Sequence, residues 1–174
     1  MAAPTVLDIQ AAELDIVNTS TETNLLLYTV PANTLGTTSA LRVLIRGDYL
    51  NNSVATKSMI VKIIYGTTTI WDDTTKALAV SATRYPVTID FILFPKNATD
   101  SQGVAGNIFI GTTGGATTGI GDLATDEINA DTPLVGANAS EDSTAAKDLK
   151  VTITHSAINV AVSMRRLYSL IEKM

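Results

Sequence analysis

The feature that most constrains the fold of this sequence is the alternation of apolar and polar residues within several separate segments. In residues 41–49 the odd positions are mostly apolar. The even positions of that segment include Arg42, Arg46 and Asp48. Residues 85–94 alternate in the same way over most of their length. Because successive side chains of a β-strand point to opposite faces, this period of two predicts strands with one buried face.

Turn-forming residues separate the alternating segments at short intervals, for example Pro31-Ala32-Asn33, Asn51-Asn52-Ser53 and Pro95-Lys96-Asn97. The pattern predicts eight strands, at residues 25–30, 41–49, 59–65, 68–71, 85–94, 104–110, 149–155 and 158–171. We therefore expect an all-β chain folded as a two-sheet antiparallel sandwich of jelly-roll-like form. An immunoglobulin-like sandwich is the alternative, and the absence of a Cys/Trp/Cys framework counts against it.

The length of 174 residues leaves room for one domain, which we place at residues 24–174. Residues 1–23 contain apolar side chains at mixed spacings. They are open to three interpretations: a short helix, an edge segment of a sheet, or an N-terminal arm that lies on another protein. Residues 111–148 form a long Gly/Thr-rich and acidic loop. Loops of that length are usually functional or held by a partner.

The composition excludes several classes of function. Twelve Lys and Arg stand against 17 Asp and Glu, giving a net charge of −5 and a pI near 4.7, so no nucleic-acid partner is expected. With no cysteine and one histidine, thiolate catalysis, cysteine zinc sites and a Ser/His/Asp triad are hard to build. No segment approaches the roughly 18 apolar residues that cross a bilayer, so no membrane partner is expected. We expect a non-enzymatic chain with no cofactor or metal.

Four short patterns suggest sites, and each has a simpler explanation. The glycine-rich residues 111–121 lack the Lys of a phosphate-binding loop and are followed by Asp122. The acidic residues between 122 and 148 do not have EF-hand spacing, so a solvated acidic face is expected instead of a calcium site. Arg46-Gly47-Asp48 spells an adhesion tripeptide but lies within a predicted strand. His155 is expected to be a hydrogen-bonded or surface histidine.

Some predicted strands are apolar on both faces, which indicates a partner surface. Ile60 and Ile64 lie on the face opposite to the main apolar side of residues 59–65. In the last strand, Arg165 and Arg166 are adjacent and should point to opposite faces unless a bulge intervenes. We expect one arginine to pair with a carboxylate, within the protomer or across a subunit contact, with a bulge at the sheet edge as the alternative.

Strand and turn residues at 30–37, 41–43, 47–52, 66–70 and 165–166 carry a resemblance to known proteins. Over residues 24–172, the sequence resembles a group of small β-rich structural proteins in the virions of tailed bacteriophages. It implies a jelly-roll-like sandwich, commonly a homotrimer, displayed on the virion surface after synthesis in the cytoplasm of the bacterial host. It carries no catalytic residues to transfer.

The leading hypothesis from this resemblance is a capsid decoration (cement) protein that binds the major capsid protein or other virion proteins, with residues 1–23 as the anchor. The residues expected at the capsid or subunit interface are Val6, Leu7, Ile9, Leu14, Ile16, Ile60, Ile64, Arg165 and Arg166. One alternative is the receptor-binding head of a tail or head fibre, in which residues 111–148 would contact a host receptor. Another is a polysaccharide-acting enzyme, which would need acidic residues such as Asp72, Asp73 and Asp90 to converge.

Overall fold

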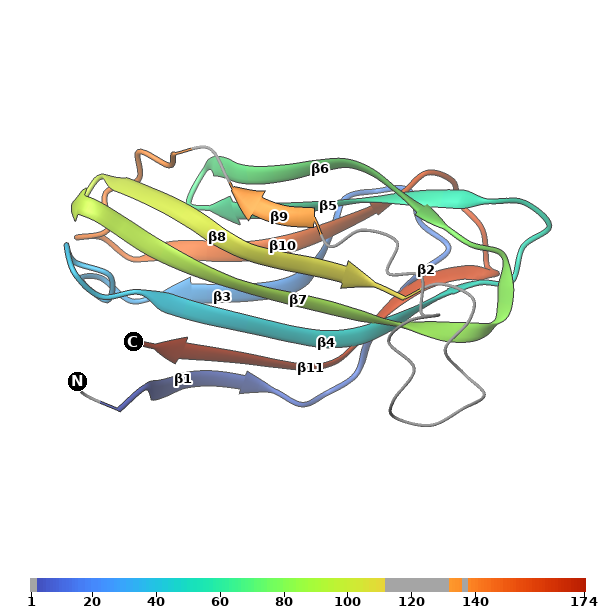
Figure 1. Ribbon diagram of the computed structural model, residues 1–174, viewed down its shortest axis with the longest axis horizontal. Helices are drawn as coiled ribbons and strands as arrows, with labels where there is room; N and C mark the ends of the chain where they lie inside the picture. Colours follow the sequence, from blue (N-terminus) through green and yellow to red (C-terminus); the bar gives the residue numbers. More distant parts are fainter. Residues whose placement is uncertain (1–2, 112–131, 136–137) are drawn as a thin grey trace.

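The computed structural model describes residues 3–111, 132–135 and 138–174, and the regular elements within these ranges are all β-strands (Figure 1). In chain order the strands are β1 Thr5–Gln10, β2 Leu14–Val17, β3 Thr23–Val30, β4 Leu41–Asn51, β5 Lys57–Tyr65, β6 Thr68–Leu78, β7 Ser81–Ala98, β8 Ser101–Ile110, β9 Thr132–Val135, β10 Lys147–His155 and β11 Val162–Lys173. Within the described ranges, no helix has the length and apolarity needed to cross a membrane.

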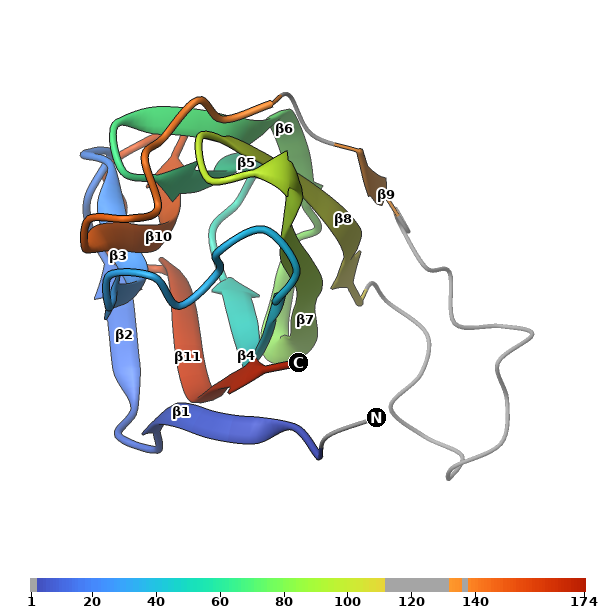
Figure 2. The ribbon, with the colours of Figure 1, turned by 90° about the vertical axis from the view of Figure 1, so that its left-hand side faces the viewer.

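The strands form two antiparallel sheets that pack as the layers of a sandwich (Figure 2). The large sheet has the order β1-β11-β4-β7-β8-β9, and β2 pairs with the half of β11 that β1 leaves free. The small sheet has the order β3-β10-β5-β6. The set β1-β11-β4-β7 opposite β3-β10-β5-β6 has the strand order of a jelly roll. The expected fold class is therefore confirmed, with β8 and β9 as additions to the large sheet.

The N-terminal residues are part of this sandwich. Of the interpretations left open for residues 1–23, the described residues show an edge segment, because β1 and β2 both pair with β11. Ile16 lies opposite Met164, and its side chain is buried in the core. β1 is thus the first strand of the jelly roll. The predicted strand at 104–110, which becomes β8, is an added strand instead.

Each of the eight predicted strands is present, but three of them, β6, β7 and β11, have clearly different boundaries. β6 continues to Leu78, well beyond the predicted end at 71. β7 runs through Pro95-Lys96-Asn97, where a turn was expected. The polypeptide does not turn there because Asn97, with φ of +61°, forms a bulge that shifts the register with β8. β11 begins at Val162, since residues 158–161 belong to a loop.

The core lies between the two sheets and is built from the predicted inward positions. In β4 the odd residues from Leu41 to Tyr49 face the core, and in β7 those from Tyr85 to Leu93 do the same. Aromatic side chains are few, and Tyr49, Tyr65 and Phe91 are the largest that are fully buried. Branched aliphatic residues fill most of the remaining space, as the low aromatic content of 5% requires.

The turns of the sandwich gather at two opposite ends. At the terminal end, Thr5 of β1 pairs with Lys173 of β11, and the turns at residues 66–67, 99–100 and 138–146 lie there as well (left in Figure 1). At the distal end lie the loops 18–22, 52–56, 79–80 and 156–161. Register fixes the distal group, because the strands that flank these loops pair with one another at that end.

Candidate functional site

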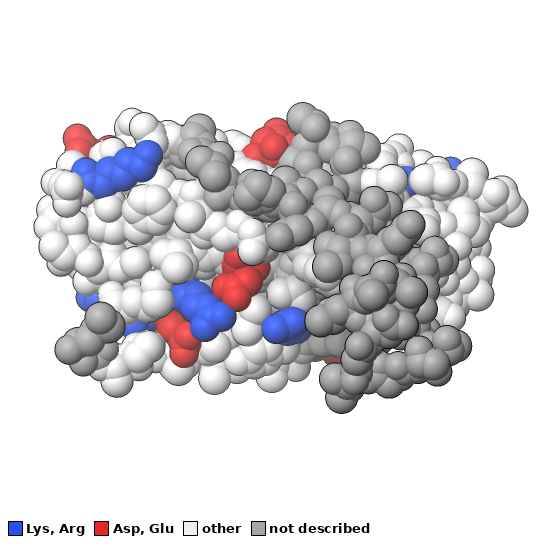
Figure 3. All heavy atoms as spheres, in the orientation of Figure 1, with Lys and Arg blue, Asp and Glu red and all other residues white. Residues whose placement is uncertain are grey.

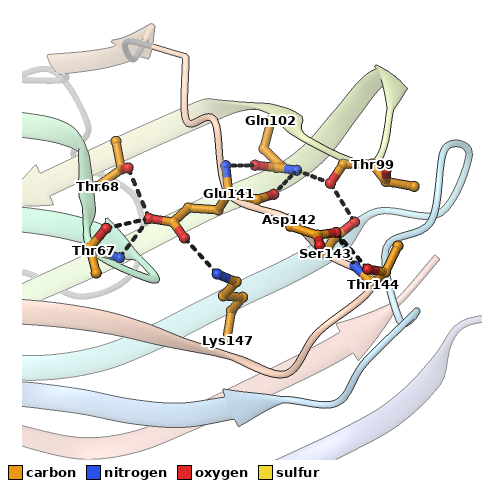
Figure 4. Close-up of polar contacts among 9 residues, drawn as sticks. All are labelled: Thr67, Thr68, Thr99, Gln102, Glu141, Asp142, Ser143, Thr144 and Lys147. Atoms are coloured by element: carbon orange, nitrogen blue, oxygen red, sulfur yellow. Dashed lines mark hydrogen bonds and ion pairs between the residues drawn. The ribbon is translucent and has the colours of Figure 1, made fainter.

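A dense polar cluster of the described chain surrounds Glu141 at the terminal end (Figure 4). The Glu141 carboxylate accepts hydrogen bonds from the backbone N–H and the hydroxyl of Thr67, both at 2.7 Å, and from the Thr68 hydroxyl at 3.0 Å. The Lys147 ammonium pairs with the other carboxylate oxygen at 2.9 Å. Four donors therefore converge on one buried carboxylate. We call Thr67, Thr68, Gln102, Glu141 and Lys147 the Glu141 clamp.

The turn between β5 and β6 is shaped to receive this carboxylate. Gly66 adopts φ of +61°, a left-handed conformation that favours glycine. A Cβ at Gly66 would overlap the carboxyl group of Glu141. The Gly66 N–H donates to the Asp148 carbonyl at 2.8 Å, which joins the turn to β10. Glycine is needed here both for the backbone conformation and for the space.

Gln102 fixes the backbone on the other side of Glu141. Its side-chain nitrogen donates to the carbonyls of Thr99 and Glu141, at 2.8 and 2.9 Å, while its side-chain oxygen accepts from the Glu141 N–H at 3.2 Å. Ser143 donates its N–H and its hydroxyl to the Thr99 carbonyl. The Asn33 N–H donates to the Ser143 carbonyl at 2.8 Å. These bonds hold residues 138–146 against two neighbouring turns.

The electrostatics of the clamp suit a structural role. Burial alone would raise the pKa of Glu141, but the Lys147 ammonium and the Thr67 and Thr68 donors outweigh it and lower the pKa to about 2. Burial, with the charges of Glu141 and Asp142, raises the pKa of Tyr65 to about 12. A carboxylate whose oxygens are occupied by donors and which stays ionised at neutral pH has little capacity to transfer protons or attack a substrate.

Metal ligation has no support in the residues that the structure describes, which contain no group of three or more His, Cys, Asp or Glu side chains able to hold an ion. Part of the acidic stretch considered for calcium, namely Asp122, Asp126, Glu127 and Asp131, lies outside the described residues. The glycine-rich stretch lies outside them as well, from residue 112 onward.

The acidic residues considered for polysaccharide hydrolysis belong to different layers of the sandwich. Asp90 lies on β7 of the large sheet, where its carboxylate pairs with the Arg42 guanidinium at 2.8 Å. Asp72 and Asp73 belong to β6 of the small sheet. The strand order thus separates Asp90 from the other two.

The two adjacent arginines of β11 have different surroundings. Arg165 lies on the outer face of the large sheet and binds both oxygens of Asp48, at 2.7 and 3.2 Å. Arg84 donates to the same carboxylate at 2.8 Å. The expected arginine–carboxylate pair therefore exists within the protomer. The pairing register of β11 with β4 shifts only after the two arginines, between Arg166 and Tyr168, and β11 is flanked by strands on both sides. The alternative, a bulge at the sheet edge that changes how the two arginines point, is therefore not what the structure shows.

Arg166 is buried at the edge where the two sheets meet. It donates to the carbonyls of Leu25 at 2.8 Å and Ala12 at 3.3 Å, and to the side chain of Gln10. These bonds connect β11 to β3 and to the β1–β2 connection. Arg166 thus closes one side of the sandwich.

The adhesion-like tripeptide Arg46-Gly47-Asp48 makes contacts within the fold. Gly47 lies so close to the backbone of Arg165 that a Cβ would overlap its carbonyl oxygen. Asp48 is held by two arginines, and Arg46 donates to the Thr88 hydroxyl at 2.8 Å. All three residues lie within β4. None of them forms a protruding loop of the kind that adhesion receptors grip.

The nine residues predicted at an interface do not share one surface. Val6 and Ile9 are about half exposed on β1, whereas Leu7 and Leu14 pack against the core and Ile16 is buried within it. Ile60 and Ile64 are half-buried on the outer face of the small sheet. Arg165 is on the outer face of the large sheet, and Arg166 is internal. A single contact could include Val6, Ile9 and Arg165, but not Ile60 and Ile64, which lie on the opposite layer.

His155 is buried at the end of β10, which corrects the expectation of a hydrogen-bonded or surface histidine. Neither ring nitrogen has a hydrogen-bond partner among the described residues. Burial lowers the pKa of His155, and the nearby Thr19 backbone and Asp15 charge oppose this effect only in part. A lone neutral imidazole without an oriented partner is not arranged as a catalytic base.

Comparison with known proteins places the chain in no family. No family model and no curated protein matches the sequence. Among solved structures, one match is the CBM2 module of the evolved Dit of Lactobacillus casei BL23 phage J-1. The identity is 11% and the TM-score 0.36, with 84% of this chain and 67% of that chain covered.

Proposed function

We propose that the chain is a non-enzymatic structural protein of a bacteriophage virion, and specifically a capsid decoration (cement) protein that binds the capsid surface as an oligomer. The observation that carries this proposal is the use of the polar side chains. Glu141, Asp48 and Arg166 are all engaged in bonds that hold strands and turns together. Among the residues that the structure describes, the part left for function is the molecular surface, with its exposed apolar side chains and open sheet edges.

The positions behind the sequence resemblance support a shared fold. Gly66, Thr67 and Thr68 form the turn that receives Glu141. Gly47 and Asp48 are fixed against Arg165 by close backbone approach and by an ion pair. These contacts are internal to the fold, and they leave the outer surface free to fit different partners.

A decoration protein acts by burying area on the assembled shell, so that detachment of any shell subunit also costs the bound contacts. In this chain the β1 edge is a suitable contact, because Val6 and Ile9 are exposed there and the outer backbone groups of an edge strand are free to pair. The major capsid protein is the proposed partner. In this proposal the edge strand β1 anchors the chain to the capsid, in place of a separate N-terminal arm.

The test is co-sedimentation of the purified chain with capsids assembled without it. We expect many copies to bind each capsid. We also expect the double variant Val6→Asp with Ile9→Asp to bind at least about tenfold more weakly, since charge in an apolar contact costs more than about 1.4 kcal/mol. The matched control is Leu27→Asp, a similarly exposed aliphatic residue on β3.

Failure of the wild-type chain to bind capsids would contradict the decoration role. If the same preparation bound host cells instead, the function would be that of a receptor-binding fibre head. If the preparation degraded a capsular or cell-wall polysaccharide, the non-enzymatic assignment would be overturned.

A further inference from the structure

The distal end of the sandwich gathers exposed aliphatic side chains from four separate parts of the chain. Of the ten large hydrophobic residues that are exposed in the described chain, five lie here: Val17, Val54, Val80, Ile158 and Val160. Val54 is fully exposed, and Ile158 and Val160 are 68% and 76% exposed. Single exposed hydrophobic residues are ordinary, but a cluster marks a contact surface.

Three of these loops, 52–56, 79–80 and 156–161, are held together by backbone and amide hydrogen bonds. The buried amide of Asn51 donates to the Leu78 carbonyl at 2.8 Å and to the Ala55 carbonyl at 3.2 Å, joining loops 79–80 and 52–56. The Asn52 N–H donates to the Ala161 carbonyl at 2.9 Å, which adds loop 156–161. The apolar side chains of these three loops therefore stand on a hydrogen-bonded base. A surface organised before binding loses less conformational entropy when it binds.

The distal end is also unusual in its charge. Loops 52–56, 79–80 and 156–161 contain no charged residue, although charged residues make up 17% of the chain. In Figure 3 the outermost tip at this end, on the right, is drawn in the white of uncharged residues. Loop 18–22 contributes one charge, Glu22, which is paired with Lys62 at 3.1 Å.

We infer that the distal end is a contact surface between two copies of this chain. A symmetric contact places the same patch on both partners, so any patch with net charge meets its own sign. The chain as a whole carries a charge of −5, and the distal loops are a place where two copies can meet without like charges in direct contact. Branched aliphatic side chains from both copies then leave water together.

The same residues argue against a membrane as the occupant. Surfaces that enter a lipid interface combine aromatic side chains with Lys or Arg. The four distal loops contain neither class, and a negatively charged chain is repelled by anionic headgroups. An apolar protein surface fits the patch better.

The experiment is sedimentation velocity of the full chain over a concentration series, at low and high salt. We expect reversible association that strengthens with salt, because added salt screens the repulsion between two anionic chains. The double variant Val54→Asp with Val160→Asp should reduce the association constant at least about tenfold. The milder pair Val54→Thr with Val160→Thr keeps the side-chain shape and should weaken association to a smaller degree. The threonine pair also tests the inference if the aspartate variant fails to fold.

The matched control is Val6→Asp, which places the same substitution at the terminal end on a residue that is 51% exposed. We expect Val6→Asp to self-associate as the wild type does, while it weakens capsid binding, so the two proposals fail separately. A wild-type chain that stays monomeric at all concentrations overturns the inference. So does association that survives both double variants, or that Val6→Asp abolishes.

Discussion

Glu141 is the residue whose surroundings most clearly define its role. The acidic region between residues 122 and 148 was interpreted from the sequence as a solvated face. Glu141 is instead buried, and its carboxylate is held by four donors, namely the N–H and hydroxyl of Thr67, the hydroxyl of Thr68 and the ammonium of Lys147. Thr67 and Thr68 are far away from Glu141 in the chain. The spacing within residues 122–148 contains no sign of these partners.

We predict that Glu141→Gln destabilises the fold by about 2 to 4 kcal/mol at neutral pH, since the amide nitrogen of glutamine cannot accept the hydrogen bonds that one carboxylate oxygen now accepts. Equilibrium urea unfolding measures this loss. The neighbouring Asp142 is a suitable control, because its carboxylate is exposed and accepts only from the N–H and hydroxyl of Thr144. Asp142→Asn should therefore cost much less stability than Glu141→Gln, and equal losses would contradict the importance of the clamp.

The acid dependence follows from the same group. The pKa of Glu141 is about 2 in the folded chain against an ordinary value of 4.5, so its stabilisation is complete above about pH 4.5 and is lost as the pH falls toward 2. The wild type should lose up to about 3 kcal/mol in this window, and Glu141→Gln should lose less. Urea unfolding at several acidic pH values compares the two chains. Equal acid sensitivity would show that another group titrates.

His155 governs a different pH window. Because burial lowers its pKa, the folded chain prefers the neutral ring, and the unfolded chain takes up a proton first as the pH falls below about 6.5. We predict a loss of stability between about pH 7 and pH 5 that is smaller in His155→Leu. Urea midpoints of both chains at several pH values test it. A wild type with constant stability across this window would rule out His155 as the titrating group.

At the scale of the elements, two turn glycines allow the cost of a left-handed backbone conformation to be separated from the cost of steric overlap. Gly66 has φ of +61° and lies against the Glu141 carboxyl group, whereas Gly36 has φ of +55° with open space around its Cα. We predict that Gly66→Ala destabilises the fold by about 2 kcal/mol or more and Gly36→Ala by about 1 kcal/mol. Thermal unfolding of the two variants provides the comparison. Equal losses would indicate that the overlap with Glu141 is relieved at no cost.

Strand positions were predictable where one face is buried and the other is wet, as in β4, because packing imposes the period of two. The prediction of strand boundaries was weaker where the same residues are compatible with two local structures. Pro95-Lys96-Asn97 suits a turn, but Asn97 can also form a bulge within a long strand. Residues 1–23 lack strict alternation, because β1 contains an irregularity between Val6 and Asp8. The burial of Ile16 depends on pairing with β11 and has no local signature.

At the scale of the whole molecule, one core joins both sheets. Trp71, the single tryptophan, lies in β6 of the small sheet and is buried in that core. We predict that tryptophan fluorescence and far-ultraviolet circular dichroism report the same urea midpoint, because the sheets cannot separate without exposing the core. Two distinct midpoints would mean that the small sheet unfolds on its own.

The pairing of Thr5 with Lys173 places the start of the first strand beside the end of the last. A fluorescent protein, an affinity handle or a surface linker attached through either terminus would therefore stand at the same end of the sandwich. Immobilised on a sensor chip in this way, every molecule would present Val54 and Val160 outward. The position of the termini thus fixes which end of the sandwich faces outward, and a display scaffold could use this arrangement without circular permutation.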